Sequence, residues 1–133
     1  MRGSSRAPGE ISVLLVDDSF VMRRVLERAL RQAGLAIGEI FEAPNGAEAL
    51  DILAEHPVDL ILSDINMPRM GGLELLREIR ARRLAAGVPV VMVTTESGEE
   101  SVREAIAAGA QGYIRKPFTA EQVKQRVLSL VNA

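Results

Sequence analysis

Five short apolar runs alternate along the chain with five amphipathic stretches, and this alternation predicts the fold. Three of the runs are almost wholly aliphatic, which is typical of strands buried on both faces. The runs predict strands at residues 12–16, 39–43, 58–63, 88–93 and 111–114. Between the runs, apolar residues recur every three or four positions, as on one face of a helix. They predict helices over residues 20–33, 46–53, 72–83, 98–109 and 120–133, with caps at Ser19, Asn45, Ser97 and Thr119 and a stop at Gly34.

Strictly alternating strands and helices predict an α/β protein with a parallel sheet covered on both faces. For five strands, we expect a doubly wound, flavodoxin-like sheet in the order 2-1-3-4-5 with five helices. Ligands of such sheets bind beyond the carboxyl ends of the strands, beside the first strand. The residues that end the strands are therefore the first place to look for function.

Composition limits the kinds of function. The chain has 133 residues, enough for one domain, and it contains no cysteine, which excludes disulfides, thiolate metal sites and cysteine nucleophiles. Its formal charge of −2 argues against a nucleic-acid-binding surface. A single histidine, His56, makes a histidine-based metal site or a Ser-His-Asp triad a poor fit.

The ends of the chain carry separate expectations. Residues 1–10 are small and polar without periodicity, so we expect a disordered lead or a scar left by cloning, followed by one folded domain over residues 11–133. No apolar run reaches the roughly 20 residues that span a bilayer. We therefore expect a cytoplasmic protein that contacts no membrane.

Polar or charged residues follow four of the five predicted strands. Asp17 and Asp18 follow the first strand, Asp64 the third, Thr94 the fourth and Lys116 the fifth. Because strands one and three are neighbours in the expected order, three carboxylates converge, and like charges so close require a compensating cation. An all-oxygen site suits Mg²⁺. Carboxylates, a divalent cation, an ammonium and a hydroxyl together suit the attack of a carboxylate on a phosphoryl group.

Spacing alone leaves open which of the three acids is attacked. Two other acids serve as controls. Asp51 lies on a helix face and Asp59 at the opposite end of the third strand, so both are interpreted as structural.

Together, Asp17-Asp18, Asp64-x-Asn66-Met67-Pro68, Thr94 and Lys116-Pro117-Phe118 resemble the receiver domain of two-component response regulators. The resemblance runs from Ile11 to the end of the chain. It is closest to the stand-alone chemotaxis regulators of the CheY type, through residues 22–24, 66–68, 72–76 and 112–113.

The resemblance implies that Asp64 accepts a phosphoryl group from a phosphohistidine on a sensor histidine kinase. It also implies that Asp18 and Asp64 bind Mg²⁺ directly, Asp17 through water, and Asn66 through its carbonyl oxygen. The last role would explain why a buried strand is followed by the irregular loop over residues 64–72, since that loop must turn a backbone oxygen toward the metal.

The same resemblance assigns Thr94 and Lys116 to the phosphoryl oxygens and implies a cis Lys116–Pro117 peptide. Tyr113 would be a switch aromatic that takes up space vacated when Thr94 moves toward the phosphoryl group. The surface of the fourth helix, fifth strand and fifth helix would then change. That face carries charged residues that would help to dock partners, among them Glu99.

Residues beside the expected site set the lifetime of the phosphoryl group. Asn66 and Glu96 resemble the chemotaxis pattern and predict a short lifetime. Thr95 stands where a small residue is frequent, and we expect it to alter the access of water. Gly71 stands where an acid is frequent, and we expect it to loosen the loop.

The expected function is a diffusible, monomeric phospho-signalling protein of chemotaxis, with a kinase, a phosphatase and the flagellar motor switch as partners. It would not be an enzyme, apart from self-phosphorylation from small donors and self-dephosphorylation. The absence of a linker after Ala133 favours this reading, and the alternative is a receiver excised from a larger regulator or hybrid kinase. A phosphohydrolase is disfavoured because Asn66 replaces the acid that would protonate a leaving group, and a degenerate receiver because no site residue is missing.

Overall fold

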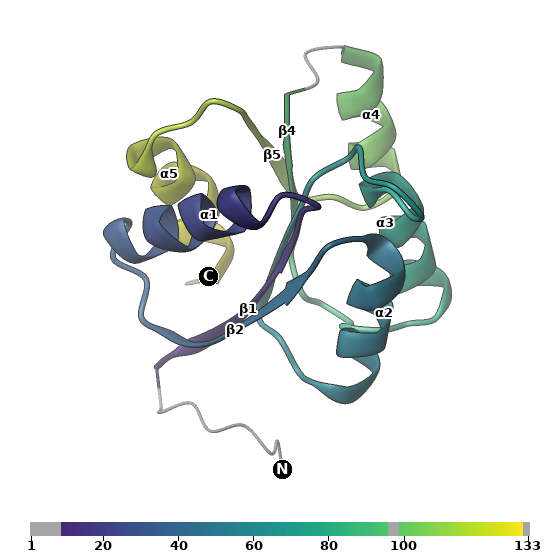
Figure 1. The fold of residues 1–133 in the computed structure, drawn as a ribbon, viewed down its shortest axis with the longest axis horizontal. Helices are drawn as coiled ribbons and strands as arrows, with labels where there is room; N and C mark the ends of the chain where they lie inside the picture. The colour runs from purple at the N-terminus through teal and green to yellow at the C-terminus, as the bar shows by residue number, and fades with distance from the viewer. Residues whose placement is uncertain (1–8, 96–98, 132–133) are drawn as a thin grey trace.

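The computed structural model describes residues 9–95 and 99–131, in which a five-stranded parallel sheet lies between two layers of helices (Figure 1). The strands pair in the order β2-β1-β3-β4-β5, which confirms the predicted topology. The strands are β1 (Ile11–Val16), β2 (Ile37–Ala43), β3 (Leu60–Ser63), β4 (Val90–Thr94) and β5 (Gly112–Arg115). The helices are α1 (Phe20–Gln32), α2 (Gly46–Glu55), α3 (Gly72–Ala81), α4 (Glu99–Ala107) and α5 (Ala120–Val131). Residues 1–8, most of the expected lead, lie outside the described residues.

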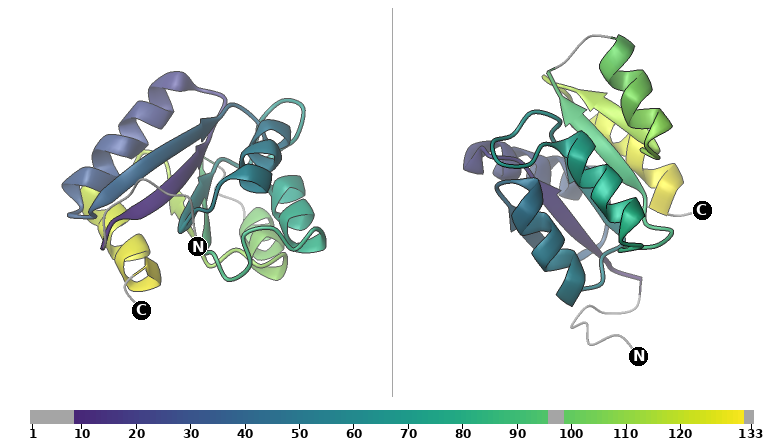
Figure 2. Two further views of the ribbon diagram at one scale, coloured as in Figure 1. Left: turned by 90° about the horizontal axis from the view of Figure 1, so that it is seen from below. Right: turned by 90° about the vertical axis from the view of Figure 1, so that its right-hand side faces the viewer.

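The sheet separates two apolar cores. Helices α1 and α5 cover one face, and α2, α3 and α4 cover the other (Figure 2). Alternate residues of β1 divide between them: Val13 and Leu15 pack toward α1 and α5, while Leu14 and Val16 pack toward α2 and α3. All four side chains are fully buried. A strand covered on both faces must be apolar at every position, which is why β1 is an unbroken aliphatic run.

Helix starts follow the predicted caps. The Ser19 hydroxyl accepts the Met22 amide at 3.1 Å, and the Asn45 side chain accepts the Glu48 amide at 2.9 Å. The Thr119 hydroxyl accepts the Gln122 amide in the same way. Gly34 follows α1 with φ of +90°, the left-handed conformation that favours glycine after a helix. Ser97, the predicted cap of α4, lies outside the described residues.

Some predicted boundaries are wrong, and one apolar residue of a helix does not lie in the core. β4 begins at Val90 rather than at residue 88, because Pro89 has no amide hydrogen to give to a ladder. α3 ends at Ala81, because Arg83 takes a left-handed φ of +55°. On α1, the apolar residues Met22, Val25, Leu26 and Ala29 recur at helical spacing. Val25 is nevertheless 43% exposed, whereas Leu30 is fully buried.

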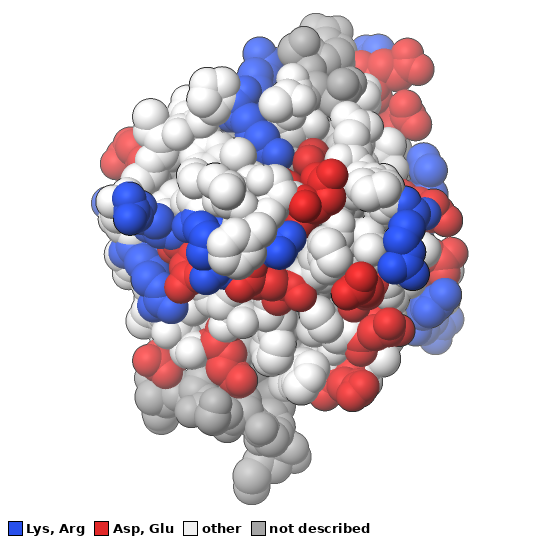
Figure 3. Space-filling view, viewed as in Figure 1, with Lys and Arg blue, Asp and Glu red and all other residues white. Residues whose placement is uncertain are grey.

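Charge is unevenly spread over the visible face of the molecule. Lysine and arginine side chains gather at the left of Figure 3, over α1, and acidic side chains gather at its lower right, over α2. Helix α1 contributes four arginines, Arg23, Arg24, Arg28 and Arg31. Among the described residues, no helix combines the length and the apolar character needed to cross a bilayer.

Candidate functional site

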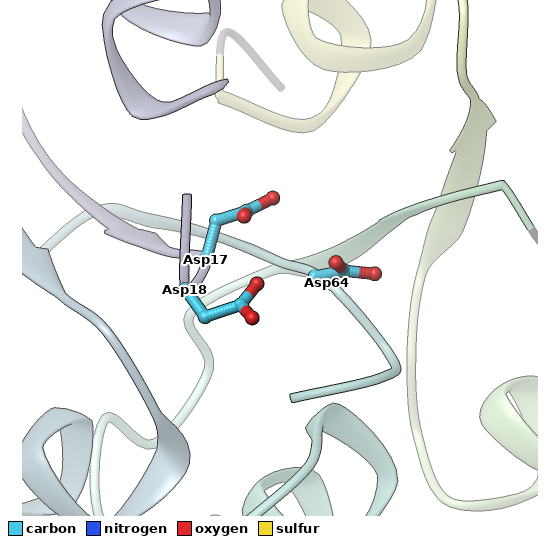
Figure 4. Close-up of side chains that lie close together, drawn as sticks. All are labelled: Asp17, Asp18 and Asp64. Atoms are coloured by element: carbon cyan, nitrogen blue, oxygen red, sulfur yellow. The ribbon is translucent and has the colours of Figure 1, made fainter. Parts of the chain in front are cut away.

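Three aspartates meet at the carboxyl edge of the sheet. Asp17 and Asp18 follow β1, and Asp64 follows β3, the neighbouring strand. One carboxylate oxygen from each lies within 4.8 Å of the others. Figure 4 shows the carboxylates of Asp17 and Asp18 extending from the end of β1 toward the side on which Asp64 lies. The convergence predicted from strand order is therefore confirmed, and we call these three residues the acidic cluster.

The members of the acidic cluster differ in exposure. Asp17 is 1% exposed, Asp64 is half-buried and Asp18 is exposed. The buried Asp17 is held by its neighbours: its Oδ1 accepts the Ser19 amide at 2.8 Å, and its own amide donates to the Ala43 carbonyl at 3.0 Å. The cluster thus has one side chain fixed inside the protein and one open to solvent.

The loop after Asp64 is shaped by close backbone approaches. Asp64 Oδ1 accepts the Ile65 amide at 2.7 Å and the Asn66 amide at 3.4 Å, which turns the chain sharply after β3. A Cβ on Gly72 would lie 2.1 Å from the Asp64 carbonyl oxygen, and one on Gly71 would lie 2.7 Å from the Ile65 carbonyl oxygen. At both glycines the loop lies close against its own backbone, so a side chain at either position would require the loop to shift.

Lys116 supplies a positive charge between two of the acids. Its Nζ lies 3.0 Å from Asp17 Oδ2 and 3.3 Å from Asp64 Oδ2, and its side chain is only 12% exposed. The Lys116 amide donates to the Thr94 carbonyl at the end of β4, and the Lys116–Pro117 peptide is cis, as expected. The ammonium therefore joins the end of β5 to the ends of β1 and β3.

Burial and crowding perturb the titration of this group. Burial raises the pKa of Asp64 above its ordinary value of 3.8, and the charge of Asp17 raises it further, against the opposing pull of Lys116. For Lys116, burial alone would lower the pKa, but hydrogen bonds and charge from Asp17 and Asp64 outweigh it and raise the pKa. The cluster thus holds three carboxylates and one ammonium, and the negative charge of ionised Asp64 is only partly compensated by Lys116.

These residues fit a hard divalent cation. The donors are all oxygens, one of them solvent-exposed, and the charge they carry exceeds the charge of the lysine beside them. Such a donor set suits Mg²⁺ or a similar ion.

The other predicted site residues lie on β4, on β5 and in the loops that follow β3 and β4. Thr94 is the last residue of β4 and is fully buried, and Asn66 is exposed in the loop after Asp64. Tyr113 is half-buried on β5, where it pairs with Met92, and the Arg126 guanidinium lies 5.9 Å from the centre of its ring. Thr95 is exposed directly after β4. Glu96 and the side chain of Glu99 lie outside the described residues.

Both control acids lie outside the acidic cluster, as predicted. Asp59 lies at the opposite end of β3, where its Oδ2 accepts the Ser12 amide at 2.8 Å. Asp51 is exposed on α2.

Sequence reasoning missed one residue of this region, Arg23 on α1. Its Nη1 donates to the Asp17 carbonyl oxygen, and its Nε lies 2.8 Å from Glu42 Oε1 on β2. Glu42 stands 19 positions away in the sequence. No local pattern signals such a pair, because an arginine on a helix is most often solvated.

Known proteins resemble this chain along most of its length. Residues 13–128 match the response regulator receiver domain. The chain is 40% identical to a CheY homolog, a chemotaxis protein of Campylobacter jejuni, over 118 residues, or 88% of this chain and 89% of that protein. It is 39% identical to the chemotaxis protein CheY of Pseudomonas aeruginosa, over 88% of this chain and 93% of that one.

Solved structures agree with the sequence matches. The chemotaxis response regulator CheY4 of Vibrio cholerae superposes with a TM-score of 0.80 at 35% identity, covering 91% of this chain and 98% of that one. The match in sequence and in fold has one explanation: the chain belongs to the response regulator receiver domain family, the phospho-signalling domains of two-component systems.

Proposed function

We propose that this response regulator takes a phosphoryl group from a sensor histidine kinase onto Asp64. The observation that carries this proposal is the position of Asp64: it lies in the acidic cluster, half-buried, with the Lys116 ammonium 3.3 Å from its Oδ2. Of the three acids, Asp17 is almost fully enclosed and Asp18 is exposed. Asp64 alone combines partial access with a cation already in contact.

The proposed phosphoryl transfer is a displacement at phosphorus. A carboxylate oxygen of Asp64 attacks the phosphorus of a phosphohistidine, the P–N bond breaks, and the imidazole leaves with the electron pair and takes a proton from solvent. Hydrolysis reverses the modification: water attacks the phosphorus, phosphate departs and the Asp64 carboxylate is regenerated. Small donors such as acetyl phosphate would enter by the same route.

Each neighbouring residue has a proposed role. Lys116 exchanges its contact with Asp64 for the phosphoryl oxygens, and the Thr94 hydroxyl donates to them. The proposed Mg²⁺ ligands are Asp18 and Asp64 directly, Asp17 through water and the Asn66 carbonyl. When bound, the ion supplies the positive charge that offsets the carboxylates and the phosphoryl oxygens.

The signal leaves the site through the face formed by α4, β5 and α5. We infer that movement of Thr94 toward the phosphoryl group lets Tyr113 turn inward, which shifts the population of this face between two forms. Asn66 and Glu96 would tune the rate of hydrolysis, and Thr95 would alter the access of water.

Chemotaxis is the setting that the relatives favour, since both curated relatives described above are chemotaxis proteins. A histidine kinase would be the phosphodonor, and a motor switch protein and a phosphatase would be downstream partners. A receiver of a larger regulator would share the chemistry and differ only in output.

The decisive experiment incubates the protein with Mg²⁺ and acetyl phosphate or beryllofluoride. We expect a mass increase of one phosphoryl group with acetyl phosphate, and a change in the fluorescence of Tyr113, the only tyrosine of a chain without tryptophan. Asp64→Ala should abolish both, while Asp51→Ala, a carboxylate removed from the exposed face of α2, should leave both intact. Modification of the Asp64→Ala protein at the wild-type rate would move the phosphoacceptor elsewhere.

A further inference from the structure

Arg23 holds the end of β1 from outside the acidic cluster. It lies in α1, yet its side chain is only 13% exposed, because its guanidinium is directed back toward β1 and β2. Nη1 donates to the carbonyl oxygen of Asp17, and Nε pairs with Glu42 Oε1 at 2.8 Å. The Arg23 guanidinium therefore ties a side chain of β2 to the last peptide of β1.

The peptide that joins Asp17 to Asp18 is fixed by this contact. The Asp17 amide donates to the Ala43 carbonyl at 3.0 Å, so both the N–H and the C=O of Asp17 are hydrogen-bonded, the first to a backbone carbonyl and the second to the Arg23 side chain. Because a peptide unit is planar, holding the Asp17 carbonyl also sets the direction of the Asp18 amide and hence where the Asp18 side chain starts.

Asp18 depends on its backbone more than the other two acids do. Asp17 is anchored by Ser19 and Lys116, and Asp64 by Ile65 and Lys116. The Asp18 carboxylate, by contrast, makes no hydrogen bond or ion pair with any residue of the described chain, and it is exposed. Rotation of the peptide before it would move this carboxylate out of the acidic cluster.

We propose that Arg23, clamped by Glu42, is a positioning residue for the metal site: it holds the Asp17–Asp18 peptide so that the Asp18 carboxylate faces Asp64. This inference rests on the proposed function, in which Asp18 is a ligand of Mg²⁺. It assigns to the Arg23–Glu42 pair the part that outer-shell partners play in other metal sites, where their loss weakens metal affinity.

Position and charge predict opposite results when Arg23 is removed. If the guanidinium acted only through its positive charge, its loss would leave the acidic cluster more anionic, and Mg²⁺ would bind more tightly. If it acts by holding the peptide, its loss weakens binding. The sign of the change in Mg²⁺ affinity therefore separates the two explanations.

The test is calorimetric titration of the full chain with MgCl₂. We expect Arg23→Met to raise the dissociation constant for Mg²⁺ about tenfold, the usual scale for a lost outer-shell partner. Arg23→Lys keeps the charge but lacks the planar fork that reaches two partners at once, and should bind nearly as weakly. Arg28→Met, an exposed arginine of the same helix, is the matched control and should bind within about twofold of wild type.

Glu42→Gln tests whether the pair acts as a unit. Alone it should weaken Mg²⁺ binding, but added to Arg23→Met it should cause no further loss, since the clamp is already open. Independent, multiplicative losses would overturn the proposal, as would wild-type or tighter affinity in Arg23→Met or in Arg23→Lys.

Two readouts keep folding and function apart. Urea unfolding in EDTA identifies any variant that is not folded, and if Arg23→Met fails this check, Arg23→Lys decides the question. The NMR shift of the Asp18 amide in the metal-free protein should move in Arg23→Met and stay unchanged in Arg28→Met. Absence of Mg²⁺ binding by the wild type would refute the proposed function, whereas normal binding by a folded Arg23→Met protein would refute only the role of Arg23.

Discussion

Neutralising Asp64 should stabilise the metal-free protein, although the change removes an ion pair. In the absence of a divalent cation, the Asp64 carboxylate is repelled by Asp17 and Asp18 and attracted by Lys116. The raised pKa of Asp64, caused first by burial, shows that its charged form is the disfavoured one. Asp64→Asn keeps the shape of the side chain and removes the charge, so it isolates this balance.

The magnitude follows from the distances. At an effective dielectric constant of about 20, each repulsion between oxygens no more than 4.8 Å apart is at least about 3.5 kcal/mol, and the attraction to Lys116 across 3.3 Å is about 5 kcal/mol. Two repulsions less one attraction leave about 2 kcal/mol, and solvent around the exposed Asp18 weakens its share. We expect Asp64→Asn to raise the metal-free unfolding free energy by about 1 kcal/mol.

Urea unfolding in EDTA and in MgCl₂ measures both sides of this prediction. At ten times its dissociation constant, Mg²⁺ should stabilise the wild type by about 1.4 kcal/mol and the variant by less, so the metal narrows or reverses the difference. Asp51→Asn, an exposed acid outside the cluster, should change neither value. A metal-free Asp64→Asn protein that is less stable than wild type would refute the electrostatic account, and so would an equal gain from Mg²⁺.

Three further predictions use the same unfolding measurement. Because the pKa of Asp64 is raised by folding, the penalty of its ionisation is absent below pH 3.8 and grows as the pH rises through the folded-state pKa, so the metal-free advantage of Asp64→Asn should vanish in acid; a constant difference from pH 3 to 7 would contradict this. Gly72→Ala should cost about 3 kcal/mol because its Cβ would lie 2.1 Å from a carbonyl oxygen, while Gly112→Ala, with its nearest neighbour at 3.5 Å, should cost far less; equal losses would show that the loop yields. Asn45→Ala should lower the free energy of unfolding by about 1 kcal/mol, because it removes the acceptor of the Glu48 amide. Asn45→Asp keeps an acceptor and should be nearly as stable as wild type; an equal loss in both variants would show that the cap is not the cause.

The order of the strands could be predicted because it depends on few features. Aliphatic runs such as residues 12–16 and 88–93 require cover on both faces, and alternation with helices then leaves few topologies. Placing strands one and three side by side was enough to bring Asp17, Asp18 and Asp64 together. Boundaries were less accurate, since the start of β4 depends on Pro89 and the end of α3 on the left-handed Arg83.

What could not be predicted depends on contacts between distant parts of the chain. The choice of Asp64 among three acids came from the family resemblance, since spacing treats them alike. The exposure of Val25 and the burial of Leu30 follow from how α1 is rotated on the sheet, which a periodic pattern defines only to within one position. Arg23 could not be identified from the sequence, because the position of its guanidinium depends on an ion pair with Glu42, which lies 19 positions further along the chain in β2.

The Lys116 contact with Asp17 joins residues 99 positions apart, from the first strand of the chain and the loop after the last. A partly assembled sheet that lacks β5 leaves the acidic cluster without the Lys116 ammonium. A sheet that lacks β3 leaves the cluster without Asp64. Affinity for the cation therefore requires the completely folded chain, and the stoichiometry of a Mg²⁺ titration reports the fraction of correctly folded molecules. Any substitution that destabilises β5, even one distant from the acidic cluster, should therefore be detected first as a loss of Mg²⁺ affinity and of response to the phosphodonor.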